Sequence, residues 1–369
     1  MHLVDITMFY APQSGGVRRY LDAKRSWFCA HTEYQYSLVV PSDCETTENN
    51  VHSLPAMRLP FGHGYRFPVI SHPWRSKLKA LKPDIIEVED PYRLAWVALS
   101  VGKSLNVPVV GFYHSDIVKL YGERFGKMNE KLMSAYVTKL YERFDLVMAP
   151  SASVANSLQA LGLSNVALCP FGVDTDLFNP VFQRSWFKPR LGISDNTTLL
   201  TFVGRNSAEK NIDLLTEMMD ILGPQYHLLL VGPDMTQTPA KNITVWSEYV
   251  VGQVLSEVLA SADIFVHAGD CETFGFIIAE AMACGTPVAG FARGAVPELV
   301  DDRVGQLADE LSPSALAACV KQLARQDMSV KSARAHDKIK QTLSWDLCFK
   351  NLVAHYESLV YTRQVCQST

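Results

Sequence analysis

Short apolar, β-branched runs alternate along the chain with longer stretches of helical periodicity. The runs in the first half predict strands at His2–Ile6, Tyr36–Val40, Ile85–Glu89, Val109–Tyr113, Leu146–Ala149 and Val166–Leu168. Those in the second half predict strands at Leu199–Val203, His227–Val231, Ile243–Val245, Ile264–His267 and Pro287–Gly290. The helical stretches between them include Gly16–Ala30, Lys127–Arg143, Asn211–Leu222 and Phe276–Cys284. This alternation implies parallel sheets with right-handed crossovers, and two consecutive sets imply two doubly wound α/β domains.

The segment Pro170–Pro189 is the expected domain boundary. It is rich in proline and lacks helical periodicity, and a fresh strand–turn–helix unit starts soon after it, at Leu199. The last helical pattern, Trp345–Tyr361, follows a polar stretch at Lys331–Thr342. We therefore expect one domain over residues 1–172 and a second over residues 173–344.

Composition narrows the class of protein. A chain of 369 residues favours two domains, and a net charge of -4 gives no general field for holding nucleic acid. The eight cysteines form no C-x-x-C pair, which is typical of reduced thiols in a cytoplasmic protein. The opening residues, MHLVDITMFY, lack the pattern of a signal peptide, and no apolar run is long enough for an ordinary transmembrane helix.

Two carboxylates bracket the strand–loop–helix unit within Asp263–Val300. Glu272 precedes the expected helix and Glu280 lies in its second turn. The amide groups at the helix start form an anion site that suits a diphosphate, and they belong to Phe274, Gly275, Phe276 and Ile277. Glu272 could bind sugar hydroxyls and Glu280 ribose hydroxyls, since a carboxylate accepts two hydrogen bonds from a diol. The alternative is that Glu272 caps the helix and Glu280 is a surface residue.

Two cations lie in the preceding strand-to-helix loop, within Thr201–Leu215. Arg205 and Lys210 follow the strand that ends at Val203, so they are expected at the same sheet edge as Glu272. Fixed cations there could neutralise a leaving diphosphate, whose negative charge grows as the glycosidic bond breaks. The alternative is a solvated basic turn.

Three weaker signals complete the set of candidates. Gly15-Gly16 would let the backbone approach a ligand at a helix start, and His114 lies at the end of a strand. Neither a G-x-G-x-x-G nor a Walker A pattern is present, so no dinucleotide fingerprint is supported. Asp174-Thr175-Asp176 falls in the interdomain connection and is interpreted as a turn, so no metal site is expected.

An ordered set of motifs resembles the retaining GT-B glycosyltransferases of family 4. The E-x7-E signature reads Glu272-TFGFIIA-Glu280 within ETFGFIIAEAMACGTPV. The similarity extends to GGVRRY, CPFGVDTDLFNP, FVGRNSAEKN, GAVPELV and the Ser344-Trp345 entry to the last helix. The resemblance implies two Rossmann-like domains facing an interdomain cleft, with residues 1–172 binding the acceptor and 173–344 the nucleotide sugar. The helix over 345–369 would pack back onto the N-terminal domain.

The resemblance also implies roles for individual residues. Gly16, Arg205 and Lys210 would bind the donor diphosphate, and His114 would lie beside the transferred sugar. Glu272 would bind the sugar hydroxyls near the amides of residues 274–277, and Glu280 the ribose. The donor would be a UDP- or GDP-sugar, transferred with retention of configuration and without a metal or other cofactor. No carboxylate stands out as a nucleophile, so we expect a front-face route.

The acceptor half departs from the family pattern. Asp84–Pro91 reads DIIEVEDP, with Glu87 and Glu89 where family members often carry a histidine. Trp74–Lys82 and Lys119–Arg143 are basic and contain apolar side chains, which suits contact with an anionic membrane as well as an ordinary solvated helix face. A lipid, a lipid-linked saccharide or another glycan is the expected acceptor, reached in the cytoplasm or on the inner face of the membrane.

Two other functions are compatible with part of the pattern. An epimerase or phosphorylase could share the architecture, although the former needs several acid–base carboxylates and the latter a much longer chain. A sugar-nucleotide-binding partner subunit without activity is the second alternative. It would be free to lose Arg205, Lys210, Glu272 and Glu280, and all four are present.

Overall fold

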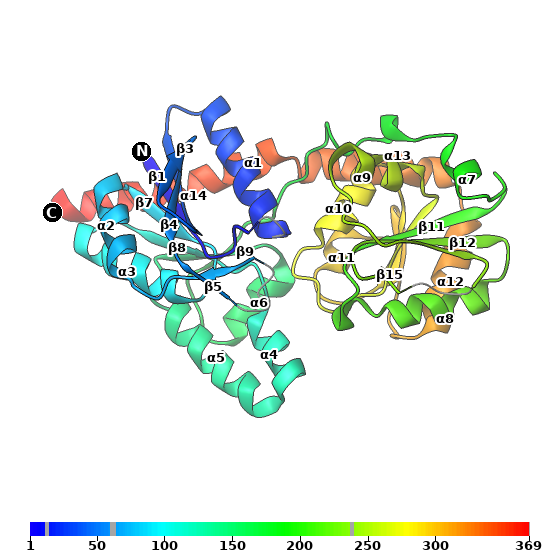
Figure 1. Ribbon diagram of the computed structural model, residues 1–369, viewed down its shortest axis with the longest axis horizontal. Helices are drawn as coiled ribbons and strands as arrows, with labels where there is room; N and C mark the ends of the chain where they lie inside the picture. The colour runs from blue at the N-terminus through cyan, green and yellow to red at the C-terminus, as the bar shows by residue number, and fades with distance from the viewer. Residues whose placement is uncertain (12–14, 60–63, 237–239, 369) are drawn as a thin grey trace. The chain divides into compact units, whose positions relative to one another are not determined.

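The computed structural model describes residues 1–11, 15–59, 64–236 and 240–368, with side chains up to residue 365. The chain divides into two compact units (Figure 1). Unit 1 contains Met1–Gly172 and Trp345–Thr369, and unit 2 contains Val173–Ser344. Each unit is described by itself below.

Unit 1 is built on an eight-stranded sheet with the order β10-β9-β8-β7-β1-β2-β4-β3. All neighbours are parallel except β3 and β4. The strands are β1 (His2–Ile6), β2 (Gln35–Ser42), β3 (Thr46–Glu48), β4 (Val51–Pro55), β7 (Ile85–Val88), β8 (Val109–Phe112), β9 (Leu146–Ala149) and β10 (Val166–Leu168). A small antiparallel pair consists of β5 (Met57–Arg58) and β6 (Arg66–Phe67).

Seven helices of unit 1 lie in the described residues. They are α1 (Gly16–His31), α2 (His72–Leu81), α3 (Arg93–Leu105), α4 (Ile117–Phe125), α5 (Lys127–Tyr141), α6 (Ala152–Ala160) and α14 (Trp345–Ser368). The last of these returns to the unit from the far end of the chain and packs on α1, where Trp27 Nε1 donates to Asp346 Oδ1 at 3.1 Å. The C-terminal helix is therefore part of the structure that holds α1 against the sheet.

Unit 2 is built on a six-stranded, all-parallel sheet with the order β13-β12-β11-β14-β15-β16. Its strands are β11 (Thr198–Val203), β12 (Tyr226–Val231), β13 (Ile243–Trp246), β14 (Ile264–His267), β15 (Val288–Phe291) and β16 (Gly305–Ala308). Its helices are α7 (Phe187–Arg190), α8 (Ile212–Leu222), α9 (Gly252–Ser261), α10 (Phe276–Ala283), α11 (Val296–Leu299), α12 (Pro313–Ala324) and α13 (Met328–Thr342). Two 3₁₀ turns are η1 (Pro180–Phe182) and η2 (Ala208–Lys210).

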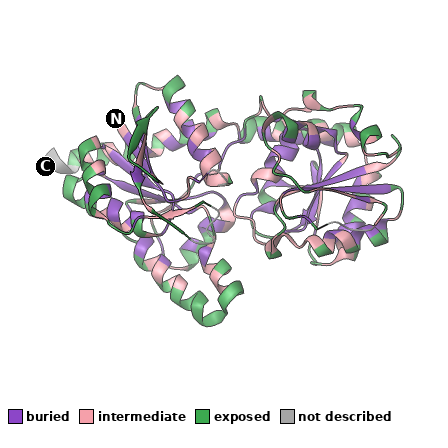
Figure 2. Ribbon diagram, viewed as in Figure 1, coloured by how far each residue is buried: buried purple, intermediate pink, exposed green. Residues whose placement is uncertain are grey.

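The strands read as continuous apolar runs because helices cover both faces of each sheet (Figure 2). Consecutive residues of β11 point to opposite faces of the sheet. Leu199 packs in a cluster with Val258 of α9, whereas Leu200 packs in a cluster with Leu215 of α8 and Leu316 of α12. In Figure 1, α8 and α12 lie on one side of this sheet and α9 and α10 on the other.

The predicted fold class is confirmed, and all eleven predicted strands are present with ends shifted by at most two residues. The exposed strands β3 and β5, the partly buried β6, the β4 strand and the terminal strand β16 have no counterpart among the predicted strands. The polar stretch at Lys331–Thr342, for which no helix was predicted, forms most of α13. Buried Ala335 and Ile339 face the unit there while polar residues cover the other side, so the apolar stripe is too short to predict a helix.

Candidate donor site

The loop between β14 and α10 places Glu272 at the carboxyl edge of the unit 2 sheet. The strand ends at His267, and the helix starts at Phe276 after Gly275, whose φ of 89° is left-handed. Gly275 is the N-cap and provides no side-chain hydrogen bond to the helix. The N-cap position therefore belongs to Gly275 and not to Glu272. The helix ends as expected, with Gly285 at a φ of 77° just beyond it.

Glu272 contacts two basic side chains. Its Oε1 atom pairs with Lys210 Nζ and lies 3.1 Å from His267 Nε2. Burial alone would raise the pKa of Glu272, but the hydrogen bond from His267 and the charge of Lys210 outweigh it and lower that pKa to about 2. Glu272 is thus held as a carboxylate at any physiological pH, which is the form that accepts hydrogen bonds from hydroxyl groups.

The loop after β11 meets the loop after β14. Because the two strands are parallel neighbours, both loops leave the same edge of the sheet. Asn211, at a left-handed φ of 50°, donates from Nδ2 to the carbonyl of Ala268 at 2.9 Å and ties the loops together. Lys210 therefore lies against Glu272 and is not part of a simple solvated turn, whereas Arg205 is exposed in the same loop.

Glu280 is buried in the second turn of α10, with 1% of its surface exposed. Its interpretation as a surface residue is therefore wrong. Phe274 is buried too, and its ring packs edge-on against Phe276 with centroids 5.0 Å apart. Gly275 and Ile277 complete the helix start.

The other two candidates belong to unit 1. Gly16 is the first residue of α1, with Gly15 as its N-cap. His114 follows β8, and its ring stacks on two aromatic rings, with its centroid 4.6 Å from that of Phe112 and 5.2 Å from that of Phe171. Its Nε2 atom bonds to Glu89, and burial lowers the pKa of His114 to about 3.

A pocket of about 150 Å³ opens beside His114. Aromatic and polar groups share its wall, including Phe9, Glu89, Tyr92, His114 and Tyr141. This mixture suits a small hydroxylated group, whose ring can pack on aromatic faces while its hydroxyl groups find polar partners.

The sequence pattern alone assigns no role to His267 or Glu89. His267 is the last residue of a buried strand and precedes Glu272 by five positions, which is a signal that could have indicated its contact. Glu89 was noted only as a departure from a family pattern. The Asp174-Thr175-Asp176 stretch forms a turn in which Asp174 Oδ1 accepts from the amides of Asp176 and Leu177, as interpreted from the sequence.

Two family models together match most of the chain. The model for Glycosyltransferase Family 4 matches residues 14–177, and the model for glycosyl transferases group 1 matches residues 183–341. The chain belongs to the GT-B glycosyltransferases of family 4. The predicted family and the predicted enzyme class, a glycosyltransferase that uses a nucleotide sugar, are thereby confirmed.

Named relatives of this glycosyltransferase differ in the sugar that their names give. It is 30% identical to the sulfoquinovosyl transferase SQD2 of Arabidopsis thaliana over 259 residues, which are 67% of this chain but only 50% of that protein. It is 27% identical to a GDP-mannose-dependent alpha-mannosyltransferase of Mycobacterium tuberculosis over 324 residues, 84% of this chain and 82% of the relative.

Solved structures share the fold of this glycosyltransferase at low sequence identity. Sucrose-phosphate synthase from Thermosynechococcus elongatus has a TM-score of 0.79 at 18% identity, covering 98% of this chain and 100% of that one. Anabaena HepE in complex with UDP and glucose has a TM-score of 0.75 at 18% identity, covering 97% and 100%. These likenesses bear on the fold alone.

Proposed function

We propose that this enzyme moves a hexose from UDP or GDP to an acceptor hydroxyl with retention of configuration. The observation that carries the proposal is the Lys210–Glu272 pair at the carboxyl edge of the unit 2 sheet, directly before the start of α10. Open α/β sheets bind ligands at that edge. A nucleotide sugar needs cations for its diphosphate and acceptors for its hydroxyl groups, and this edge provides both.

In this proposal the donor diphosphate lies at the amino end of α10, with Arg205 and Lys210 opposite its charge. The pairing with Lys210 keeps Glu272 ionised for the sugar hydroxyls and offsets its repulsion of the phosphates. Glu280 binds the ribose from the second turn of the helix. The base lies near Trp246–Val251, where Tyr249 is 57% exposed. For unit 1, we propose that Gly16 binds the diphosphate and His114 the transferred sugar.

Chemistry at this site would need no metal, because Arg205, Lys210 and the helix start carry the stabilisation of the leaving diphosphate. The transfer would follow a front-face route in which the departing phosphate helps to deprotonate the acceptor. Nuclear magnetic resonance of the product gives the anomeric configuration, and a chelator should leave the rate unchanged. Isolation of a covalent glycosyl-enzyme would rule out the front-face route.

The acceptor would be a lipid, a lipid-linked saccharide or another glycan at a membrane surface. The support is the hairpin of α4 and α5, which exposes Phe125, Met128 and Leu132 (53%, 72% and 64%). Basic side chains lie on the same two helices, namely Lys119, Arg124, Lys127 and Lys131. Apolar and basic groups together suit an anionic lipid surface. By contrast, Trp74 of α2 is buried in the core, so it adds nothing to such a surface.

Flotation with liposomes tests the membrane contact. Binding should appear with anionic and not with zwitterionic vesicles, and should fall in a Phe125→Ser/Met128→Ser double variant. Equal recovery of both proteins would count against this surface. None of the described helices is both long and apolar enough to cross a bilayer.

A thermal-shift panel of nucleoside diphosphates and their sugars tests the donor. Ligand at about 100 times its Kd stabilises the native state by about 2.7 kcal/mol, so the correct nucleotide should raise the Tm most. Lys210→Ala should abolish that shift, whereas Lys321→Ala, on α12 of the same unit, should keep it. The proposal fails if neither UDP, GDP nor their sugars shifts the wild-type Tm.

A further inference from the structure

A buried ionic cluster lies beneath His114 in unit 1. Lys24 of α1 donates from Nζ to Asp5 on β1 at 3.0 Å and to Glu87 on β7 at 2.7 Å. Tyrosine hydroxyls complete the shell: Tyr20 and Tyr356 donate to Glu87, and Tyr36 donates to Asp5. The side chains of Lys24, Asp5 and Glu87 have no exposed surface. The single ammonium of Lys24 therefore already serves two carboxyl groups.

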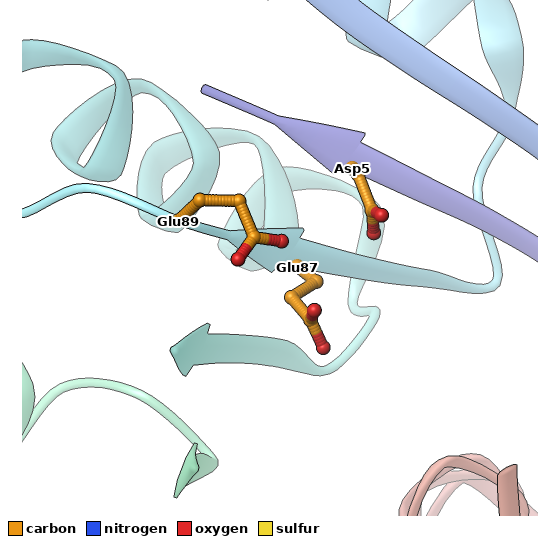
Figure 3. A group of neighbouring side chains, drawn as sticks. All are labelled: Asp5, Glu87 and Glu89. Carbon is orange, nitrogen blue, oxygen red and sulfur yellow. The ribbon is translucent and has the colours of Figure 1, made fainter. Parts of the chain in front are cut away.

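Glu89 adds a third carboxyl group to the same place. It leaves β7 two residues after Glu87 and hence on the same face (Figure 3). Oxygens of Asp5, Glu87 and Glu89 lie within 4.8 Å of one another. Among the described residues, Lys24 contacts Asp5 and Glu87 but not Glu89. If Glu89 were a carboxylate, it would thus be a third buried negative charge that no ammonium group contacts.

The two oxygens of Glu89 have different surroundings. Oε2 bonds to His114 Nε2. Oε1 is buried, and no donor within the described part of the chain reaches it. The side chain of Glu87 is in hydrogen-bonding contact with Glu89, but two carboxylates can bond only if one of them carries a proton. Glu87 accepts from Lys24 and two tyrosines, so the proton belongs on Glu89.

We propose that Glu89 is a protonated carboxyl group that donates from Oε1 to Glu87 and accepts at Oε2 from His114 Nε2–H. This arrangement gives every polar atom of Glu89 a partner. An anionic Glu89 beside a protonated His114 would leave two carboxylates, those of Glu89 and Glu87, in contact with no proton between them. If the proton lay instead on Oε2, donating to His114, the buried Oε1 would remain unpaired.

The direction of the pKa shifts agrees with this placement. Burial raises the pKa of Glu89 well above its usual value, and the charges of Glu87 and Asp5 raise it further. Burial also lowers the pKa of His114 to about 3, so the ring is neutral. Burial works in the same direction at Glu87, but the Lys24 charge outweighs it and lowers that pKa.

Glu89 is therefore a positioning residue for His114. With Nε2 carrying the ring proton, Nδ1 is the hydrogen-bond acceptor, and the stacking of the ring on Phe112 and Phe171 fixes its plane. The consequence for catalysis rests on the proposed function: beside the transferred sugar, His114 would accept from a hydroxyl group and would not act as a cation. The position of the proton itself does not depend on that function.

Glu89→Gln tests the proposal, because the glutamine amide can reproduce a neutral carboxyl group. Its NH₂ donates to Glu87 and its carbonyl accepts from His114. The wild type takes up a proton at Glu89 on folding above about pH 4.5, the ordinary pKa of the carboxyl. Its stability should therefore fall with rising pH, by about tenfold in the unfolding equilibrium constant per pH unit relative to Glu89→Gln. The raised pKa values of Asp5 and Asp90 affect both proteins and cancel in the ratio.

Glu87→Gln is the matched control, because it removes a carboxylate that pairs with Lys24. It should be less stable than the wild type at neutral pH, where Glu89→Gln should be at least as stable. Nitrogen-15 spectra should show a neutral His114 ring with its proton on Nε2 in both wild type and Glu89→Gln. In transfer assays Glu89→Gln should stay within a few-fold of wild type, and Glu89→Ala should not.

Three results would overturn the proposal: a pH-independent stability ratio, a Glu89→Gln protein as unstable as Glu87→Gln, or an imidazolium at His114 near neutral pH. The stability and resonance measurements need no donor. A failed nucleotide panel would therefore refute the proposed function and leave the position of the proton to be judged separately.

Discussion

Glu272 and Glu89 have similar neighbours and opposite pKa shifts. Each bonds to a histidine and lies near a lysine, and each is largely buried. Yet the pKa of Glu272 falls to about 2 despite its burial, whereas burial and neighbouring carboxylates raise that of Glu89. One of these groups is a fixed anion and the other, as we propose, a neutral hydrogen-bond donor.

The difference lies in how many carboxyl groups share one ammonium. Lys210 pairs with Glu272 alone among the carboxylates of the described chain. The hydrogen bond from His267 and the undivided charge of Lys210 together outweigh the cost of removing Glu272 from water. Lys24 already pairs with both Asp5 and Glu87. A third carboxyl group beside them is therefore more stable in its protonated, neutral form. The charge of a buried acid therefore depends on how many carboxyl groups share its basic neighbour as well as on which residues are near it.

The largest expected effect comes from removing the shared cation. Lys24→Met leaves Asp5 and Glu87 buried without an ammonium, which should destabilise the protein by about 3–5 kcal/mol. Denaturant unfolding measures the loss. Lys350→Met breaks an exposed pair with Asp346, 64% and 50% exposed, and should cost less than about 1 kcal/mol. Equal costs for the two substitutions would show that Lys24 is not the charge that holds the cluster.

Loss of the Lys210–Glu272 pair in unit 2 should reduce turnover. We expect Glu272→Ala or Lys210→Ala to reduce transfer by at least about 10²-fold, the usual scale for one preorganised charge contact. Steady-state assays with the donor identified by thermal shift measure it. Arg303→Ala, a 73% exposed residue of the same unit, should keep full activity. Wild-type rates in both site variants would contradict the assignment of the donor site.

Strand–helix alternation was enough to predict the fold class, since buried parallel strands read as apolar runs whatever their neighbours are. It did not reveal β3, β5 and β6, whose residues are mostly exposed and too few to show a pattern. The apolar stripe of α13 gives no clear pattern for a similar reason: buried Ala335 and Ile339 stand among charged residues.

Sequence spacing could place Lys210 and Glu272 at one sheet edge, because both follow parallel strands. It could not predict that His267 reaches Glu272, since that depends on the direction of a side chain within the sheet. The cluster around Glu87 is harder still. Its members come from β1, α1, β2, β7 and α14, and Tyr356 is separated from Glu87 by 269 positions. Only the folded chain brings such residues together.

Two tyrosine–glutamate hydrogen bonds involve residues of α14, and burial should make one of them contribute more to stability than the other. Tyr356→Phe removes a buried hydroxyl from Glu87, and hydrogen bonds to charged groups contribute about 1.5–3 kcal/mol. Tyr34→Phe removes an exposed bond of 2.5 Å to Glu357, where water replaces the donor and the cost should be under about 0.5 kcal/mol. Unfolding free energies of the two variants give the comparison. Similar values would mean that the Glu87 cluster admits water.

The smallest effect should come from His267, which together with Lys210 keeps Glu272 ionised. A group with a lowered pKa stabilises the folded state above its unfolded value, about 4.5 here, and loses that contribution as the pH falls towards 2. His267→Phe removes one of the two causes, so the pKa of Glu272 should rise by about one unit and stability at neutral pH should drop by about 1.4 kcal/mol. A carbon-13 titration of the Glu272 carboxyl measures the change in pKa, and unfolding between pH 2 and 7 measures the change in stability.

His227→Phe is the control for this prediction. His227 lies on β12 with its ring nitrogen 2.8 Å from Thr244, and its substitution should leave the titration of Glu272 unchanged. An unaltered pKa in His267→Phe would show that Lys210 alone keeps Glu272 charged, and the contrast with Glu89 would then depend on the lysines only.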